Sequence, residues 1–248
     1  MDARIKEILL KINKEGYQAY LVGGSSRDEL MNRSYLDVDI ATNAHPEIIE
    51  SLFEVVSNKG KMFGNIKVKY KNLLAEITTF RLEEYHYPNS YPKIKEFLDD
   101  WKEDAVRRDF KLNAIYLDAN ENIYDCFNGL QDLKAKIIDF IKEPNKRILE
   151  DPSRILRGLR LKGKLNFSFS KKTKQAILEN INEIKRLSNH KLAYEIKKTY
   201  DECGIKQTNQ LFKEYFVFKA LFGYDKEICY DNAKEVDMDT IMEQLKEQ

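Results

Sequence analysis

Two carboxylates separated by a single residue offer the clearest chemistry in the chain. Asp37 and Asp39 flank Val38, and Ile40 follows. Residues i and i+2 of a β-strand point to the same face, so both carboxylates would lie on one face. Hard divalent cations prefer oxygen ligands, and two metals about 3.5–4 Å apart can clamp an in-line phosphoryl displacement. The spacing therefore predicts a two-metal site for phosphoryl transfer at Asp37 and Asp39.

A glycine pair upstream of these aspartates offers a phosphate site. Ala19–Val22 is typical of a short buried strand, and it leads into Gly23 and Gly24 and then into a helix expected from Ser26 to Met31. Glycine lets a ligand approach the backbone closely, and a helix N-terminus attracts phosphate. Arg27, in the first turn, could contact the same phosphates. Alone, the two glycines could form an ordinary turn and the two aspartates could lie on an exposed strand face. The functional interpretation is favoured because the glycine pair and the aspartate pair occur together and in this order.

Glu76 is a third candidate carboxylate. It lies within Leu74–Arg81, a run otherwise suited to a buried strand. A buried carboxylate needs a partner or a metal, so Glu76 could help to bind metal or deprotonate an attacking hydroxyl. The alternative is a salt bridge to Arg81 or to a neighbouring lysine.

The stretch Arg107–Ala114 combines two arginines with other polar side chains. Arg108 is followed directly by Asp109, and Asn113 comes shortly afterwards. Guanidinium groups bind phosphates as forks, so this stretch suits recognition of a triphosphate and a sugar. An ordinary capped helix or loop with surface charges is the alternative.

The stretch Glu150–Arg160 combines one acceptor with several donors. Asp151 suits the N-cap of a helix. Asp151 offers acceptors and Arg154 offers donors, so together they can read the Watson–Crick edge of a base. Arg157 and Arg160 follow at helical spacing and would extend the positive face toward phosphates. A solvated amphipathic face is the alternative.

Helical and strand patterns alternate over the first 140 residues, which carry most of these candidates. The apolar spacing and alternation predict helices and strands at Ile5–Ile12, Pro46–Phe53, Ile66–Tyr70, Leu73–Phe80, Ile115–Leu117 and Ile123–Asp125. The strands on either side of Lys71 and Asn72 would form a hairpin. From about Leu133 the strand patterns fade and helical patterns continue. The sequence thus predicts an α/β head followed by an all-helical half.

The composition excludes several classes of protein. Hydrophobic residues make up 42% of the 248 and charged residues 33%, which is enough apolar material for a core. No apolar run approaches the roughly 18 residues of a membrane span, and the first residues lack a signal-peptide core. Cys126, Cys203 and Cys229 are widely spaced and form neither a disulfide framework nor a zinc pattern. We therefore expect a protein of the reducing cytoplasm.

The net charge of +1 hides a strong asymmetry. Residues 142–198 carry 16 Lys and Arg against 6 Asp and Glu, a net charge of +10, whereas residues 1–141 carry −4 and residues 199–248 carry −5. A basic segment between acidic ends is typical of a protein that binds a polyanion such as RNA. A solvated, lysine-rich helical surface is the alternative.

In their order along the chain, these motifs resemble those of class II members of the polymerase β-type nucleotidyltransferase superfamily. More specifically, they resemble the bacterial tRNA nucleotidyltransferase (CCA-adding enzyme) and poly(A) polymerase family. The resemblance covers about residues 5–185. The matching motifs are Leu21–Asp28, Asp37–Thr42, Phe63–Gly64, Glu76–Arg81, Arg107–Ala114 and Glu150–Arg154, followed by Arg157 and Arg160.

The resemblance implies an α+β fold and a role for each motif. A nucleotidyltransferase head with a small mixed or antiparallel sheet (1–140) would precede an all-helical neck (141–198) and a short helical C-terminal segment (199–248). The implied catalytic residues are Asp37, Asp39 and Glu76, with Mg²⁺ bound by Asp37 and Asp39. The residues implied in nucleotide binding are Gly23, Gly24, Arg27, Arg108, Asp109, Asn113, Asp151, Arg154, Arg157 and Arg160.

The chain departs from the family pattern at three places. An acidic-Gly-Arg-Arg-Pro element is replaced by Pro88–Pro92, and Lys111 stands where the family usually has threonine. Family members also continue into a helical body and tail, for which about residues 190–248 remain here.

The sequence therefore predicts a Mg²⁺-dependent enzyme that adds nucleotides to an RNA 3′ end without a nucleic-acid template. The expected substrates are ATP, CTP and a tRNA or another RNA, and the expected product is all or part of the CCA end. A poly(A) or A-only polymerase is one alternative, and a catalytically inert RNA-binding protein on the same scaffold is another. No membrane association is expected, and the sequence leaves the oligomeric state open.

Overall fold

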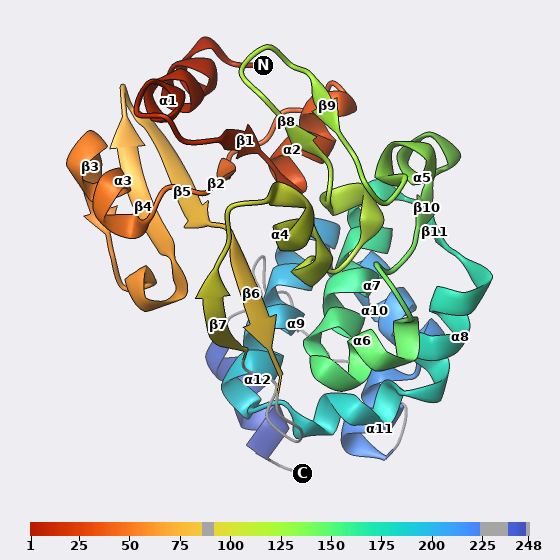
Figure 1. The fold of residues 1–248 in the computed structure, drawn as a ribbon. Coiled ribbons are helices and arrows are strands. Elements are labelled where there is room, and N and C mark those ends of the chain that lie inside the picture. The colour runs from red at the N-terminus through yellow and green to blue at the C-terminus, as the bar shows by residue number, and fades with distance from the viewer. Residues whose placement is uncertain (86–91, 224–237, 247–248) are drawn as a thin grey trace. The chain divides into compact units, whose positions relative to one another are not determined.

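The computed structural model describes residues 1–85, 92–223 and 238–246 (Figure 1). The chain divides into two compact units. The first unit contains Met1–Glu84 and Lys93–Lys134. The second contains Tyr85, Pro92 and the described residues from Ala135 onward. Of Pro88–Pro92, the stretch that departs from the family pattern, residues 88–91 lie outside the described residues.

A seven-stranded mixed sheet forms the centre of the first unit, in the order β3-β4-β5-β2-β1-β8-β9. Only β2 and β5 pair in parallel; the other neighbours are antiparallel. These strands are β1 (Ala19–Leu21), β2 (Asp39–Thr42), β3 (Glu54–Ser57), β4 (Asn65–Tyr70), β5 (Leu73–Thr79), β8 (Tyr116–Leu117) and β9 (Ile123–Tyr124). A separate antiparallel pair consists of β6 (Arg81–Glu84) and β7 (Lys93–Phe97). The predicted α+β head with a small mixed sheet is confirmed.

The helices of the first unit are α1 (Ala3–Lys14), α2 (Gly23–Leu30), α3 (Pro46–Leu52), α4 (Trp101–Arg107) and α5 (Gly129–Ala135), with 3₁₀ turns η1 (Lys61–Phe63) and η2 (Lys111–Asn113). Helix α1 buries the apolar face that predicted it, since Ile5, Ile8 and Ile12 are at most 1% exposed. These residues join one core with the inward side chains of β1, β2, β4 and β5. The predicted helices at Ile5–Ile12 and Pro46–Phe53 are thus confirmed.

The hairpin of β4 and β5 is also confirmed, with Tyr70 opposite Leu73. Its two turn residues, Lys71 and Asn72, have φ angles of 45° and 63°. Positive φ at both central residues is typical of the tight turns whose twist matches that of paired strands. The hairpin therefore adopts this geometry although neither residue is glycine.

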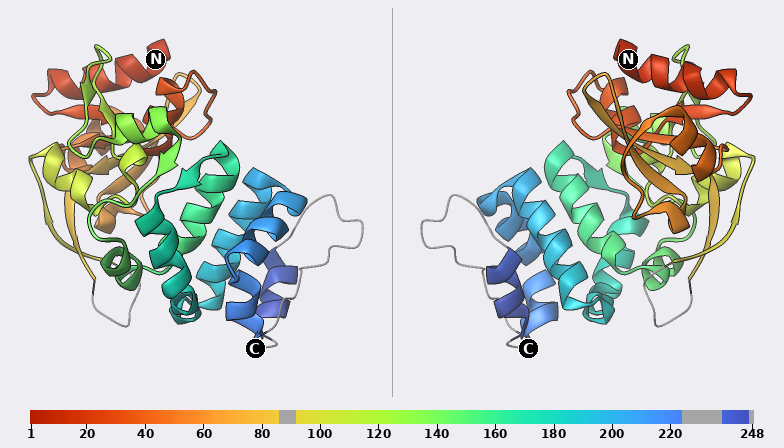
Figure 2. Two further views of the ribbon diagram at one scale, coloured as in Figure 1. Left: turned by 90° about the vertical axis from the view of Figure 1, so that its right-hand side faces the viewer. Right: turned by 90° about the vertical axis from the view of Figure 1, so that its left-hand side faces the viewer.

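The second unit consists mainly of helices, which pack beside one another (green to blue in Figure 2). They are α6 (Pro144–Glu150), α7 (Ser153–Leu165), α8 (Lys171–Glu179), α9 (Asn189–Cys203), α10 (Ile205–Glu214), α11 (Val217–Phe222) and α12 (Met238–Lys246), with the 3₁₀ helix η3 (Ile181–Arg186). Two short strands that the sequence did not indicate, β10 (Ile137–Ile138) and β11 (Ser168–Phe169), form a parallel pair. In the part of the chain that the structure describes, no helix has the length and apolar character needed to cross a membrane.

Candidate active site

Asp39 is the first residue of β2, whereas Asp37 precedes the strand. The two aspartates therefore do not share one strand as predicted. The expected alternation nevertheless extends to Asp37, because Asp37 is exposed, Val38 is buried and Asp39 is half-buried. Ser25 holds this stretch: its Oγ donates to the Asp37 carbonyl at 3.2 Å and accepts the backbone N–H of Asp39 at 2.8 Å. The start of β2 is thereby fixed to α2.

Gly23 brings three parts of the site together. Helix α2 begins at Gly23 and not at Ser26, so both glycines belong to its first turn. Gly23 has a φ of +70°, in the left-handed region that side chains disfavour. A Cβ at Gly23 would lie 3.0 Å from Asp39 Oδ2 and 3.8 Å from Arg108 Nη1. A carboxylate, a guanidinium and the start of a helix therefore meet where the glycine leaves space.

Two serines that follow the glycines are positioning residues that the sequence reasoning missed. Ser25 is 1% exposed and Ser26 is 0% exposed. Ser26 Oγ donates to the carbonyl of Ile115 at 2.7 Å and thereby ties α2 to the chain before β8. The available signal was two small hydroxyl residues in the first turn of a helix, where they commonly bond to the backbone.

Arg27 braces α2 from within. It is 3% exposed, and its Nε and Nη2 donate to the two oxygens of Asp28 at 2.8 Å each. Its Nη1 donates to Asn113 Oδ1, also at 2.8 Å. A Cβ at Gly24 would lie 3.6 Å from Arg27 Nη2. The structure thus brings together Gly24, Arg27 and Asn113, and the predicted contact of Arg27 with a triphosphate stays a prediction.

Glu76 lies next to Asp39 on the neighbouring strand, because β2 and β5 are parallel and pair these two residues. The expectation that Glu76 is buried is wrong, since its side chain is 49% exposed. Ala75 and Ile77 face the core, so Glu76 faces outward. Lys67 Nζ lies 4.0 Å from Glu76 Oε1, which is the lysine contact considered as an alternative. Among the described residues, no three acidic, histidine or cysteine side chains gather as metal ligands.

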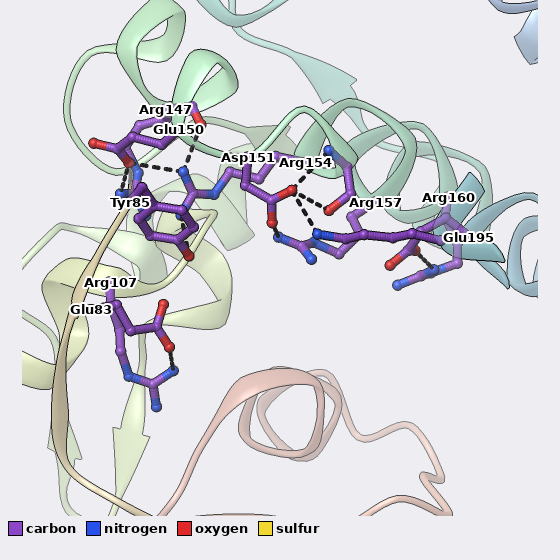
Figure 3. A network of polar contacts seen from close by, with 12 residues as sticks. Glu83, Tyr85, Arg107, Arg147, Glu150, Asp151, Arg154, Arg157, Arg160 and Glu195 are labelled. Atoms are coloured by element: carbon purple, nitrogen blue, oxygen red, sulfur yellow. Dashed lines mark hydrogen bonds and ion pairs between the residues drawn. The ribbon is translucent and has the colours of Figure 1, made fainter. Parts of the chain in front are cut away.

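A cleft of about 430 Å³ in the first unit brings Asp39 and Arg108 together with further arginines. It is lined by Val22, Asp39, Ile40, Gly60, Phe63, Asn65, Thr78, Arg81, Arg107 and Arg108. Arg81 and Arg107 both contact Glu83 Oε1, at 2.7 and 3.3 Å. Figure 3 shows the pair formed by Arg107 and Glu83. Burial, together with the charge of Arg107, lowers the pKa of Arg81 below its usual range. Asp109, half-buried, follows Arg108 directly. The cleft therefore joins the carboxylate of Asp39 to a positively charged wall.

Asp151 lies at the junction of two helices in the second unit. It is the C-cap of α6, and α7 begins at Ser153, so Asp151 is not the N-cap that was predicted. Its Oδ1 nevertheless accepts the Ser153 backbone N–H at 3.1 Å and the Lys191 ammonium at 3.0 Å. Its Oδ2 accepts Arg157 Nη2 at 3.1 Å. Burial raises the pKa of Asp151, but Arg157 and Lys191 outweigh this and leave it below its ordinary value.

Arg154 is 0% exposed and has partners other than Asp151. Its Nη1 donates to the carbonyl of Arg147 at 2.6 Å and contacts Glu150 Oε2 at 2.9 Å. Its Nη2 donates to the Tyr85 hydroxyl at 3.2 Å, and its guanidinium carbon lies 5.0 Å from the centre of the Tyr85 ring (Figure 3). Asp151 and Arg154 are directly linked, because the Arg154 backbone N–H donates to the Asp151 carbonyl at 3.1 Å, and each side chain has the further partners described above.

Arg157 and Arg160 continue along α7, as the spacing predicted (Figure 3). Arg160 Nη1 contacts Glu195 Oε2 at 2.5 Å, and its Nε lies 3.4 Å from Glu202 Oε1. Because Arg157 pairs with Asp151 and Arg160 pairs with two glutamates of α9, this face of α7 is less positive than the sequence suggested.

The part of the chain that carries this geometry matches a known protein-family model. Residues 19–139 match the family described as the poly A polymerase head domain. The matched stretch includes Gly23, Asp39 and Arg108, the three residues that meet at the start of α2.

Over most of its length, and not only in residues 19–139, the chain is similar to enzymes named CCA-adding enzyme. It is 40% identical over 216 residues to the enzyme of Staphylococcus epidermidis, and the match covers 87% of this chain and 54% of that relative. It is 42% identical over 219 residues to the enzyme of Staphylococcus haemolyticus, and the match covers 88% of this chain and 55% of that relative. Among solved structures, the Bacillus stearothermophilus CCA-adding enzyme in complex with CTP has a TM-score of 0.78 at 31% identity, covering 88% of this chain and 53% of that one. The chain thus spans about half the length of these relatives.

Proposed function

We propose that this chain is a Mg²⁺-dependent RNA 3′-terminal nucleotidyltransferase that adds all or part of the CCA end of tRNA from CTP and ATP. The observation that carries the proposal is that Asp39 and Arg108 line one cleft and both lie close to Gly23, where α2 begins. A carboxylate for metal beside donors for phosphate is the arrangement that phosphoryl transfer requires. The similarity to CCA-adding enzymes along 87% of the chain supports the choice of substrate.

The donor set of the head domain fits a magnesium ion. Asp37 and Asp39 supply carboxylate oxygens, and Mg²⁺ in proteins usually binds to one or two carboxylates together with water and substrate phosphates. Asp37 is exposed and Asp39 lines the cleft, so water and substrate phosphate can reach both carboxylates. When bound, the metal would stabilise the attacking and leaving oxygens.

In the proposed reaction, the RNA 3′-hydroxyl attacks the α-phosphorus of the nucleotide and pyrophosphate leaves. Arg108 and the backbone N–H groups at the start of α2 would hold the triphosphate, with Arg27, Asp109 and Asn113 supporting that wall. Glu76 is proposed to accept the hydroxyl proton or to help to hold metal, a role supported by its exposed side chain and its pairing with Asp39.

Base selection is proposed to lie with Asp151 and Arg154. ATP and CTP each present an exocyclic amino donor and a ring-nitrogen acceptor, whereas UTP and GTP present a carbonyl and a ring N–H in the corresponding places. An ionised carboxylate accepts only and a guanidinium donates only, so this pair complements ATP and CTP. Because Asp151 contacts Lys191 and Arg157, reading a base requires it to exchange one of these partners for the amino group. Arg157 and Arg160 would support the two base-reading residues.

A poly(A) or A-only polymerase is the second candidate function. The observation that favours it is the match of residues 19–139 to a head domain described for poly A polymerase. An inert RNA-binding protein is the alternative outside catalysis.

The cytoplasm remains the proposed compartment, and among the described cysteines Cys126 and Cys203 are free thiols.

The deciding experiment uses tRNA that ends directly before CCA. It is incubated with CTP alone, ATP alone and both, with and without Mg²⁺, and the 3′ ends are sequenced. Ends completed to CC or CCA support the proposal, and runs of A from ATP alone support the poly(A) candidate. Asp39→Ala is the control for contaminating activity. Unchanged ends with wild-type protein that still binds RNA would support the inert alternative.

A further inference from the structure

A fully buried carboxylate, Asp104 on α4, connects the arginines of the cleft. Its Oδ1 accepts Arg107 Nε at 2.7 Å and the backbone N–H of Arg81 at 3.2 Å. Its Oδ2 accepts Arg108 Nη2 at 3.2 Å and the hydroxyl of Tyr116 at 2.6 Å. A buried carboxylate requires such compensation, and here it comes from the arginines, the backbone and one tyrosine.

Tyr116, on β8, makes the second contact with Arg108. Its hydroxyl accepts Arg108 Nε at 2.8 Å, and the guanidinium carbon lies 4.9 Å from the centre of its ring. The ring is itself fixed, because Tyr20 and Trp101 pack against it with centroid distances of 5.8 and 5.3 Å. Burial raises the pKa of the Tyr116 hydroxyl above its usual range, so it stays protonated and can donate to Asp104.

These contacts determine how Arg108 presents itself to the cleft. Nε and Nη2 are both directed toward Tyr116 and Asp104. Nη1 lies on the other side, 3.8 Å from the position of a Cβ on Gly23, where α2 begins. A side chain held on two sides loses little freedom when a ligand binds, so its donors are preorganised.

We propose that Tyr116 and Asp104 form a clamp that positions Arg108 for the triphosphate of the incoming nucleotide. Neither residue belongs to the motifs that the sequence singled out. The inference rests on the proposed function insofar as it takes a nucleoside triphosphate as the ligand of Arg108. Both residues act through Arg108, so they are positioning residues.

A double-mutant cycle tests the clamp through ATP binding, which needs no RNA and no turnover. The variants are Tyr116→Phe, Arg108→Ala and the two combined, with ATP and Mg²⁺ titrated by calorimetry. Tyr116→Phe keeps the packed ring and removes only the hydroxyl, so its Kd for ATP should rise roughly 3- to 10-fold. Arg108→Ala should raise the Kd more, by roughly 10- to 100-fold. The double variant should bind no more weakly than Arg108→Ala alone, because the hydroxyl acts through the arginine.

Tyr20→Phe is the matched control. Tyr20 belongs to the same aromatic cluster, but its hydroxyl donates to Gln18 and not toward the cleft arginines. It should leave the Kd for ATP within about twofold of wild type.

The outcomes separate the clamp from the proposed function. Equal losses of affinity in Tyr20→Phe and Tyr116→Phe, or additive losses in the double variant, would overturn the clamp. Wild-type ATP affinity in Arg108→Ala would overturn both the clamp and the assignment of Arg108. A non-additive cycle in a protein that extends no RNA would leave the clamp standing and reject the proposed function.

Discussion

Asp39 is the carboxylate with the most defined surroundings in the head domain, since it lies between Gly23, Ser25 and the neighbouring Glu76. Asp39→Ala and Asp37→Ala should each lower nucleotide addition by roughly 10²-fold or more, because charge on the transferring phosphoryl group would lose its main compensation. The circular dichroism spectrum should not change. Asp99→Ala, at an exposed site, is the control. Substantial turnover by either site variant would contradict the two-metal assignment.

A variant of Glu76 can distinguish a catalytic role from a structural one, because its ion pair with Lys67 is long and exposed. Surface pairs of this kind contribute about 0–1 kcal/mol, so Glu76→Gln should hardly change the melting temperature. The single-turnover rate should nevertheless fall by roughly 10²-fold if the carboxylate acts on the attacking hydroxyl. Lys67→Met, which removes the other member of the pair, is the control. A wild-type rate in Glu76→Gln would leave only the lysine contact as its role.

Asp104 makes the stability of the first unit depend on pH. Burial alone would raise its pKa, but Arg107 and Arg108 hold it at about 2, below the ordinary 3.8. A carboxylate with a depressed pKa stabilises the fold above its unfolded pKa and loses this effect as pH falls through the folded pKa. Asp104→Asn should therefore lower the free energy of unfolding by at least about 2 kcal/mol at pH 7. In urea unfolding, this difference from wild type should shrink between about pH 4 and pH 2. A difference that is constant with pH would contradict the assignment.

At the scale of elements, the sequence predicted the helices and strands that have one buried face. Helix α1 and the β4–β5 hairpin show the expected period because alternate residues enter the core. Strand β3 was missed because Glu54, Val55 and Val56 are all exposed, and β10 and β11 are too short to show a period.

In the candidate site, too, sequence reasoning found the residues that belong to motifs and missed those that do not. Gly23, Asp39 and Arg108 were singled out from their motifs, and the structure brings them together. Sequence reasoning did not find Ser25 and Tyr116, because each matters through a side-chain contact with another element that residue spacing does not show. Nor does a motif show which way a guanidinium points, and Arg27 faces Asp28 and Asn113.

Helix α8 is the element that tests the basic segment. Lys171, Lys172 and Lys174 are exposed on it, and Lys172 also pairs with Asp139 at 3.0 Å. Reversing all three charges should weaken RNA binding roughly 10-fold or more at low salt and flatten its salt dependence, because fewer counterions are released. Binding of free ATP should not change.

The matched control reverses Lys206, Lys213 and Lys219, which are exposed in the acidic C-terminal segment. These changes should have a smaller effect on RNA affinity, measured by filter binding over a range of salt concentrations. Equal effects of the two triple variants would mean that only net charge matters, and that α8 is an ordinary solvated face.

The junction of α6 and α7 tests base selection. Because Asp151 and Arg154 are buried, alanine at either position would remove structural contacts as well, so Asp151→Asn and Arg154→Lys are the better variants. Each should reduce the use of CTP and ATP and narrow the gap to UTP and GTP by roughly 10-fold, since an unmatched buried polar group costs about 1–3 kcal/mol. The double variant should be less than additive. Single-turnover incorporation of all four nucleotides measures this, and an unchanged preference would place base selection elsewhere.

At the scale of the whole molecule, the chain passes between its two units more than once. Tyr85 belongs to the second unit, although Glu84 before it and Lys93 after the intervening segment belong to the first. The buried guanidinium of Arg154 therefore depends on a tyrosine that lies 69 residues earlier in the chain. Residues 135–248 expressed alone would lack that partner, and simple truncation would not isolate an intact second unit.

The same connection affects the order of events during synthesis. Domains generally form from the N-terminus as the chain emerges from the ribosome. Here Tyr85 emerges before the rest of the first unit has been made, and it must wait for α7 to emerge before it can meet Arg154. Closing so long a loop has an entropic cost that only later contacts offset. The two units are therefore expected to mature in an interleaved order, with the surroundings of Arg154 completed only after α7 has emerged.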